Sequence, residues 1–132
     1  MSANLDLVRS IYAAWERGDF SHVEWADPEI EWVLVEGPSP GTWHSLVGMA
    51  ECFREWFSVF EDVRIEADEF RELDDERVLV LVEGLGGRGK ASGISLPNVK
   101  AAHVFHVREE KIIRFVAYRH RDRALADLGL EE

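Results

Sequence analysis

The stretch HVFHVREEKIIRF, residues 103–115, decides the fold. Apolar and polar residues alternate on either side of Glu109-Glu110-Lys111. This pattern predicts a β-hairpin whose strands run over residues 99–108 and 112–119. The centre of the fold is therefore an antiparallel sheet.

Other strands are predicted before this hairpin. Residues 77–82, RVLVLV, are apolar almost throughout, which is typical of a strand buried on both faces. Alternating residues predict further strands at 30–36 and 63–73, and Asp74-Asp75 marks a turn after the second of these.

Helical periodicity is concentrated in the first half of the chain. Residues 4–17 repeat apolar side chains at spacings of three and four, and a shorter helix is predicted at 20–26. The clearest helix runs over 47–59 with Ser45 as its N-cap, and a final helix is expected at 122–128. Helices layered on an antiparallel sheet make one α+β domain over the whole chain.

The amino-acid composition limits the cellular compartment and the binding partners expected for this chain. The 132 residues are 46% hydrophobic and 31% charged, as in a globular domain. Cys52 is the only cysteine, which excludes an internal disulfide and fits a reducing compartment. We expect a cytoplasmic protein, since neither a signal peptide nor a membrane-spanning run is evident. A net charge of −11 argues against nucleic-acid binding.

The glycine-rich stretch GLGGRGK, residues 84–90, matches G-x-G-x-x-G and nearly matches a P-loop. Both motifs hold phosphate at the start of a following helix. The continuation Ala91-Ser92-Gly93-Ile94-Ser95-Leu96-Pro97 does not favour a helix. We therefore expect a loosened strand end and loop, and no nucleotide cofactor.

Metal and anion sites are not expected either. His103 and His106 lie three apart on a predicted strand, so they point to opposite faces and cannot chelate one ion. The basic residues Arg119, Arg121 and Arg123 fit the solvated start of the last helix better than an anion site.

The order of these elements resembles the SnoaL-like, ketosteroid-isomerase-like branch of the nuclear-transport-factor-two-like superfamily. The resemblance is spread along nearly the whole chain and is carried by VRSIYAAWERGD (8–19), DPEIEW (27–32), residues 48–57, the hairpin 103–115 and RALADLGL (123–130). It implies a cone-shaped fold, in which a curved, mostly antiparallel sheet and three helices in the N-terminal half enclose a pocket. The superfamily includes isomerases, cyclases, dehydratases, epoxide hydrolases and binders without catalysis, so function has to be argued from the site.

Three residues are the candidate catalytic groups. Glu36 continues the face of Ile30, Trp32 and Leu34, and ketosteroid isomerases carry their proton-shuttling carboxylate in a comparable place. Tyr12 is placed like the helix tyrosine that donates to an oxyanion in those enzymes. His103 shares an apolar face of its strand and could donate to a ligand or relay a proton.

Each candidate also has a structural interpretation. Glu36 would then be a solvated loop residue, His103 a buried neutral histidine, and Tyr12 a core residue with a satisfied hydroxyl. Glu83 is the next carboxylate considered, although it could equally lie at the wet end of its strand.

We expect a mostly apolar pocket for a small organic ligand, with walls from Trp15, Trp32, Trp43, His44, Phe53, Trp56 and Phe105.

A mixed face formed by Ile112, Arg114, Val116 and Tyr118 suggests a homodimer through the sheet. Any catalysis would be metal-free and cofactor-free acid–base chemistry, namely isomerisation, cyclisation, dehydration or hydrolysis. The alternative is a non-catalytic ligand-binding or dimeric scaffold protein.

Overall fold

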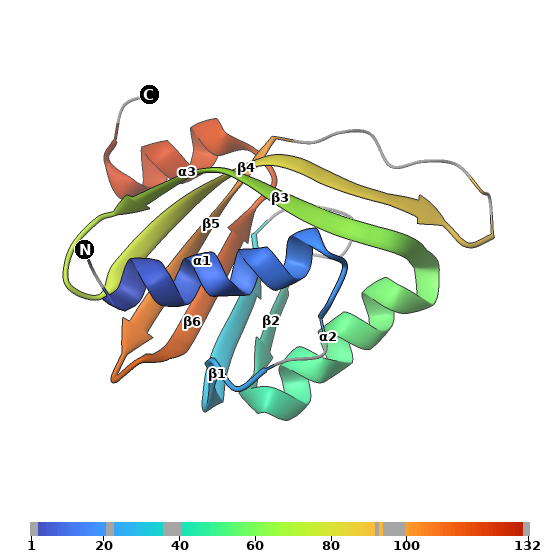
Figure 1. Cartoon of the computed structure of the whole chain (residues 1–132), viewed down its shortest axis with the longest axis horizontal. Coiled ribbons are helices and arrows are strands. Elements are labelled where there is room, and N and C mark those ends of the chain that lie inside the picture. The colour runs from blue at the N-terminus through green and yellow to red at the C-terminus, as the bar shows by residue number, and fades with distance from the viewer. Residues whose placement is uncertain (1–2, 21–22, 36–40, 92, 94–99, 131–132) are drawn as a thin grey trace.

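The structure, a computed structural model, describes residues 3–20, 23–35, 41–91, 93 and 100–130 (Figure 1). Its described part contains three helices and six strands. In chain order these are α1 (Ala3–Glu16), β1 (Ala26–Leu34), β2 (Gly41–His44), α2 (Ser45–Val59), β3 (Phe60–Glu72), β4 (Arg77–Gly89), β5 (Ala101–Arg108), β6 (Lys111–Tyr118) and α3 (Arg121–Leu128).

The six strands form one sheet in the order β2-β1-β6-β5-β4-β3. Every neighbouring pair is antiparallel except β1 with β6, which is parallel. Side chains from α1 and α2 pack on one face of this sheet, called the inner face below, and α3 packs on the opposite, outer face (Figure 1). The predicted α+β fold with a curved, mostly antiparallel sheet is confirmed.

The core consists of two hydrophobic clusters, an inner cluster between the sheet and α1 and α2, and an outer cluster between the sheet and α3. Strand β4 separates them. Val78, Val80 and Val82 point to the inner cluster, whereas Leu79 and Leu81 point to the outer one. None of the five is more than 4% exposed. The prediction of a strand buried on both faces is therefore correct, and its cause is a helix layer on each side.

The expected distribution of helices is corrected in one place. Residues 20–26 do not form the predicted helix in their described part: residue 23 is irregular, residues 24 and 25 form a turn, and Ala26 opens β1. The described N-terminal half thus holds two helices, and the third helix of the domain is α3. The apolar residues Phe20, Val23 and Trp25 still pack against the inner cluster, which explains why they imitate a helical stripe.

A short strand precedes α2 where the sequence suggested only a loop. Gly41–His44 pairs with β1, and Trp43 lies opposite Trp32. The helix begins at Ser45 itself, so the prediction of Ser45 as N-cap is wrong: His44 occupies the N-cap position, without a side-chain capping bond. Ser45 has a φ of 68°, a backbone region unusual for a residue with a side chain.

The glycine-rich stretch is a strand. β4 continues to Gly89, and its residues Gly84–Gly89 pair with Phe60–Glu66 of β3. Among the described residues, pairing of β4 with β5 ends at Val82, whereas the β3–β4 ribbon continues beyond this point (Figure 1). Because no helix begins at Gly89, the phosphate-binding arrangement of a P-loop is not formed here.

A bulge changes the predicted faces of the last strand. Val107 pairs with Ile112 but His106 pairs with Arg114, so Ile113 is an extra residue. Ile112 consequently joins the inner cluster, while Val116 and Tyr118 belong to the outer one. The prediction that Ile112 shares a face with Arg114, Val116 and Tyr118 is wrong because alternation does not continue through a bulge.

Ala124 and Leu125 of α3 cover the apolar outer face of the sheet. The homodimer therefore stays a prediction, and exposure of Leu79 and Leu81 no longer supports it. No described helix has the length and apolar composition needed to cross a membrane.

The inner cluster should dominate stability. Phe105 is fully buried and its ring contacts those of Tyr12, Trp15 and Phe115. We expect Phe105→Ala to lower the free energy of unfolding by about 3–5 kcal/mol, because it removes these contacts and leaves a cavity. Urea denaturation followed by tryptophan fluorescence measures the loss. The exposed Val59→Ala is the control and should change stability little; equal effects of the two substitutions would contradict the assignment of the core.

Candidate functional site

A tyrosine and a histidine meet in the interior of the cone. Tyr12 lies on the stripe of α1 that faces the sheet, together with Val8, Ile11 and Trp15. His103 lies on the inner face of β5, because its neighbours Ala102 and Val104 belong to the outer cluster. The Tyr12 hydroxyl and His103 Nδ1 are hydrogen-bonded, although 91 residues separate them in the chain.

Both groups are uncharged near neutral pH. Burial lowers the pKa of His103 to about 3, because the imidazolium would lose its hydration. The same desolvation raises the pKa of Tyr12 well above its usual value. Among the described buried residues, His103 is the one polar side chain in an otherwise hydrophobic set.

The two tautomers of His103 give the pair two hydrogen-bonding arrangements. If Nδ1 carries the proton, it donates to the tyrosine oxygen, and the hydroxyl hydrogen can be donated elsewhere. If Nε2 carries the proton, Tyr12 donates to Nδ1, and the Nε2–H is the remaining donor. In either state the pair retains one N–H or O–H group that could donate a hydrogen bond to a ligand oxygen.

Aromatic rings surround this pair. The ring of Tyr12 lies 5.0 Å from Trp15 and 5.7 Å from Phe70, and His103 lies 4.9 Å from Phe115, measured between centroids. Phe115 in turn stacks on Trp32 at 3.9 Å with an interplanar angle of 18°. The pair is therefore held in a nearly continuous aromatic lining.

The structure brings together most of the residues predicted to bind a ligand. Trp15, Trp32 and Phe105 are buried in the inner cluster, and Phe53, Trp43 and Trp56 are half-buried against it. His44 does not join them. It is exposed, and it pairs with Glu31, which points to the outer face and bridges to Arg114 at 2.8 Å.

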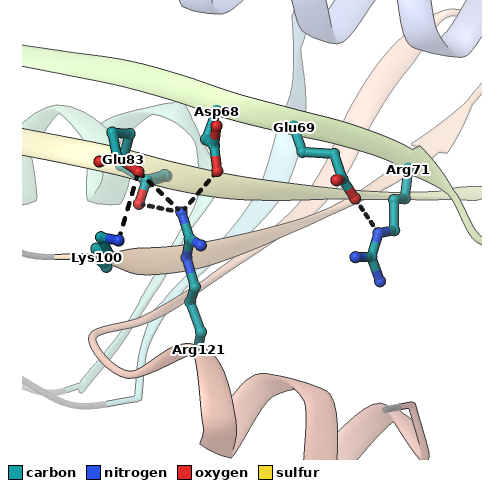
Figure 2. Close-up of polar contacts among 7 residues, drawn as sticks. Asp68, Glu69, Arg71, Glu83, Lys100 and Arg121 are labelled. Atoms are coloured by element: carbon teal, nitrogen blue, oxygen red, sulfur yellow. Dashed lines mark hydrogen bonds and ion pairs between the residues drawn. The ribbon is translucent and has the colours of Figure 1, made fainter. Parts of the chain in front are cut away.

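The predicted carboxylates are not part of the described interior. Glu36 lies outside the described residues. Glu83 points to the outer face, where its side chain is 47% exposed and lies 3.8 Å from Arg121 and 4.0 Å from Lys100 (Figure 2). The idea that Glu83 could replace Glu36 as a base beside the pair does not fit this orientation.

Three inner residues were not among the predicted site residues. Phe115 could have been found from the hairpin register, which places it opposite Phe105. Cys52 lies on the apolar stripe that periodicity predicts for residues 47–59, so its inward orientation could be expected, whereas the sequence does not specify the packing of the strand that carries Phe70. Burial raises the pKa of the Cys52 thiol to about 11, so this cysteine is a poor nucleophile.

No described group of three or more His, Cys, Asp or Glu side chains could hold a metal ion. His106 points to the outer face between Arg77 and Arg114, so the two histidines are on opposite sides of the sheet.

The sequence profile of the SnoaL-like domain matches residues 8–115, most of the chain. The chain belongs to the SnoaL-like family. Among curated proteins none matches this SnoaL-like domain significantly.

Solved structures with the same fold are numerous. An NTF2-like protein of unknown function from Burkholderia pseudomallei is 24% identical, with a TM-score of 0.79 over 96% of this chain and 97% of the other. TerC, co-crystallised with polyporic acid, is 23% identical, with a TM-score of 0.76 over 96% and 98%. A protein of ketosteroid isomerase-like fold from Catenulispora acidiphila, in complex with trimethylamine, is 17% identical, with a TM-score of 0.72 over 96% and 94%. At these identities the likeness establishes the fold of the SnoaL-like domain and leaves its chemistry to its own residues.

The buried histidine should make stability pH-dependent. The unfolded chain protonates His103 near its ordinary pKa of 6.5, whereas the folded chain does so only near 3. Because the pKa of His103 is lower in the folded chain than in the unfolded chain, protonation favours the unfolded chain. The free energy of unfolding therefore falls as the pH drops below 6.5, and it stops falling near pH 3. Between pH of about 7 and about 5 the contribution of His103 should fall by about 2 kcal/mol.

Denaturant unfolding of the wild type and His103→Gln at both pH values measures this contribution. The variant cannot protonate at this position, so its stability should fall less over the same interval. An identical pH dependence of the two proteins would contradict a neutral, buried His103.

Proposed function

We propose that this SnoaL-like domain binds a small, uncharged, mostly apolar organic molecule beside Tyr12 and His103. The observation that carries the proposal is the neutral hydrogen-bonded pair within an aromatic lining. Such a site disfavours charged ligands, because it holds no described buried counter-ion. It favours a flat molecule with one oxygen acceptor, such as a ketone, quinone or phenol.

A row of packed rings connects half-buried Phe57 with the surroundings of Tyr12. Half-buried Phe57 contacts Phe20 at 5.1 Å, and Phe20 contacts Trp15 at 5.8 Å, next to Tyr12. A ligand lying along these rings would bury apolar surface and reach the remaining donor of the pair. The polyporic acid and trimethylamine found with two structural neighbours support small organic molecules as ligands of this fold.

If the domain is catalytic, the pair is suited to stabilise an oxyanion. A neutral donor that strengthens its hydrogen bond as negative charge develops on a carbonyl oxygen lowers the barrier to enolisation. Proton abstraction would need a separate base, and Glu36 remains our candidate. This assignment gives cofactor-free isomerisation, cyclisation, dehydration or hydrolysis as the reaction classes.

A non-catalytic scaffold is the second candidate. The specific observation that favours it is the close packing of Tyr12, Trp15, Trp32 and Phe105, none of which is more than 4% exposed. In that case the Tyr12–His103 bond would serve only to satisfy two buried polar groups. The single cysteine fits a reducing compartment such as the cytoplasm, and this location is compatible with both a ligand-binding domain and a scaffold.

A matched pair of probes separates the candidates. Naphthalene and 2-naphthol have similar apolar surfaces, but only 2-naphthol carries an oxygen that can accept from the pair. We expect the wild type to bind 2-naphthol about fivefold more tightly, measured by quenching of tryptophan fluorescence, because a neutral hydrogen bond contributes about 1 kcal/mol.

If the Tyr12 hydroxyl is the remaining donor, Tyr12→Phe should remove this preference while naphthalene binding persists. Phe is the matched control because it keeps the ring contacts with Trp15 and Phe105. Failure of the wild type to bind either probe would favour the scaffold, and an unchanged preference in Tyr12→Phe would exclude the Tyr12 hydroxyl as the donor.

The catalytic role of Glu36 has its own test. Deuterium exchange from D2O into the α-positions of cyclohexanone, followed by NMR, reports enolisation without knowledge of the natural substrate. If Glu36 is the base, Glu36→Gln should slow enzyme-dependent exchange by about 10²–10⁴-fold while probe binding survives. Unchanged exchange in Glu36→Gln would place the base elsewhere.

A further inference from the structure

One nitrogen of the buried pair has no partner within the described part of the chain. The Tyr12 hydroxyl is bonded to His103 Nδ1, and no hydrogen bond to His103 Nε2 is found among the described residues. His103 is nonetheless only 7% exposed, in surroundings that are otherwise hydrophobic. Because buried polar groups in folded proteins are almost always hydrogen-bonded, this unused nitrogen needs an explanation.

A second unused nitrogen, on Arg121, shows what is special about His103. Arg121 Nε is the one fully buried side-chain nitrogen or oxygen without a partner among the described residues. The side chain of Arg121 is 14% exposed, and its terminal nitrogen donates to the carbonyl of Val82 at 3.0 Å and lies 3.4 Å from Asp68 (Figure 2). The predicted solvated position of Arg121 is therefore wrong. Arg121 Nε is enclosed by the chain, whereas His103 Nε2 retains accessible surface that a ligand atom can contact.

The strand register shows where accessible surface remains beside His103. Its neighbours on the inner face are Val80 of β4 and Ala117 of β6. Val80 is fully buried, and so are Phe105 and Phe115 on the side of the hairpin turn, with exposures of 0% and 2%. Ala117 is half-buried although it faces the interior. Of these four neighbours, the small side chain of Ala117 is the one that borders open space.

The Tyr12 hydroxyl decides which nitrogen of His103 carries the proton. Tyr12 is 1% exposed, and its hydroxyl has no acceptor other than Nδ1 among the described residues. If Nδ1 were protonated, the hydroxyl hydrogen would be buried without an acceptor, which destabilises that arrangement. We expect the tautomer protonated at Nε2 to predominate by about tenfold, because it leaves no hydrogen of the pair buried and unpaired. The accessible atom of the pair is then a donor.

We infer that the Nε2–H of His103 is the specificity-determining donor of the interior, and that it binds the oxygen of an uncharged carbonyl compound beside Ala117. The inference rests on the proposed function and narrows its ligands to one class. A hydroxyl oxygen also accepts a hydrogen bond, but its own hydrogen needs an acceptor, and the apolar side chains around the pair supply none. A carbonyl oxygen brings no hydrogen. Tyr12 is a positioning residue, because its hydroxyl keeps the proton of His103 on Nε2.

The tautomer can be measured in the free protein. In NMR spectra of the 15N-labelled imidazole, we expect Nε2 to be the protonated nitrogen of His103 and Nδ1 the unprotonated one. A ring protonated mainly at Nδ1 would overturn the inference even if ligands bind. Because this measurement needs no ligand, its outcome is independent of the proposed function, which fails instead if neither naphthalene nor 2-naphthol binds.

A matched pair of probes tests the ligand class. 2-Acetylnaphthalene and 2-isopropenylnaphthalene have nearly the same shape, but a carbonyl oxygen in the first replaces a methylene group in the second. We expect the wild type to bind 2-acetylnaphthalene about fivefold more tightly, with a shift of the Nε2 resonance that the hydrocarbon does not cause. Equal affinities, or a shift confined to Nδ1, would contradict the assignment of Nε2–H as the donor.

Two variants separate the roles of Tyr12 and His103. Tyr12→Phe removes the positioning hydroxyl and keeps the imidazole, so the protonated fraction of Nε2 should fall and the preference for the ketone should shrink without disappearing. The double variant Tyr12→Phe/His103→Leu should lose the preference entirely. It replaces both polar groups by apolar ones and leaves no unpaired group in the interior, so we expect it to fold. A preference for the ketone that survives in the double variant would place the donor elsewhere.

A third substitution tests the position of the carbonyl group. Ala117→Leu fills the space beside His103 and should weaken binding of 2-acetylnaphthalene about tenfold. Ala50→Leu makes the same change at an exposed position of α2 and should leave binding unchanged. Equal affinities of the two variants would contradict a ligand that lies beside Ala117.

Discussion

The hydrogen bond between Tyr12 and His103 is the constraint on which the interior depends. A hydroxyl and an imidazole cannot be buried among aromatic rings unless each satisfies the other, because an unpaired buried polar group costs about 1–3 kcal/mol. The bond joins α1 to β5 across the interior, and the rings of Trp15 from α1 and Phe70 from β3 pack against the ring of Tyr12. The ring contacts supply most of the stabilisation, and the hydrogen bond selects the arrangement.

The two faces of the sheet carry different chemistry as a consequence. The described charged side chains of the central strands, such as Glu83 and Arg114, lie on the outer face or at its rim, where solvent or ion pairs accommodate them. The inner face keeps a neutral polar pair within apolar walls. If the proposed ligand binds here, it would be distinguished by shape and by one hydrogen bond.

The sequence predicted the features that depend on local pattern. The stripe of α1, the double burial of residues 78–82 and the hairpin follow from periodicity, and the opposite orientations of His103 and His106 follow from strand geometry. The meeting of Tyr12 with His103 was hypothesised from two apolar faces, but its hydrogen bond depends on helix rotation that no pattern encodes. Their catalytic role stays a prediction, as does that of Glu36.

The features that were missed depend on tertiary pairing. Gly41–His44 forms a strand only because β1 supplies its partner, and the bulge at Ile113 interrupts an alternation that the sequence alone extends. Arg121 looked solvated because neither Asp68 nor Glu83 is near it in the chain.

The central claim is that His103 and Tyr12 form a neutral pair at the polar centre of the interior. NMR of the 15N-labelled imidazole of His103 tests it most directly, since the two ring nitrogens report the tautomer and the charge separately. The account predicts one protonated and one unprotonated nitrogen, no titration from neutral pH down to about pH 4, and a change of the Nδ1 signal in Tyr12→Phe. A titration midpoint near the ordinary histidine value of 6.5, or an Nδ1 signal indifferent to loss of the Tyr12 hydroxyl, would contradict it.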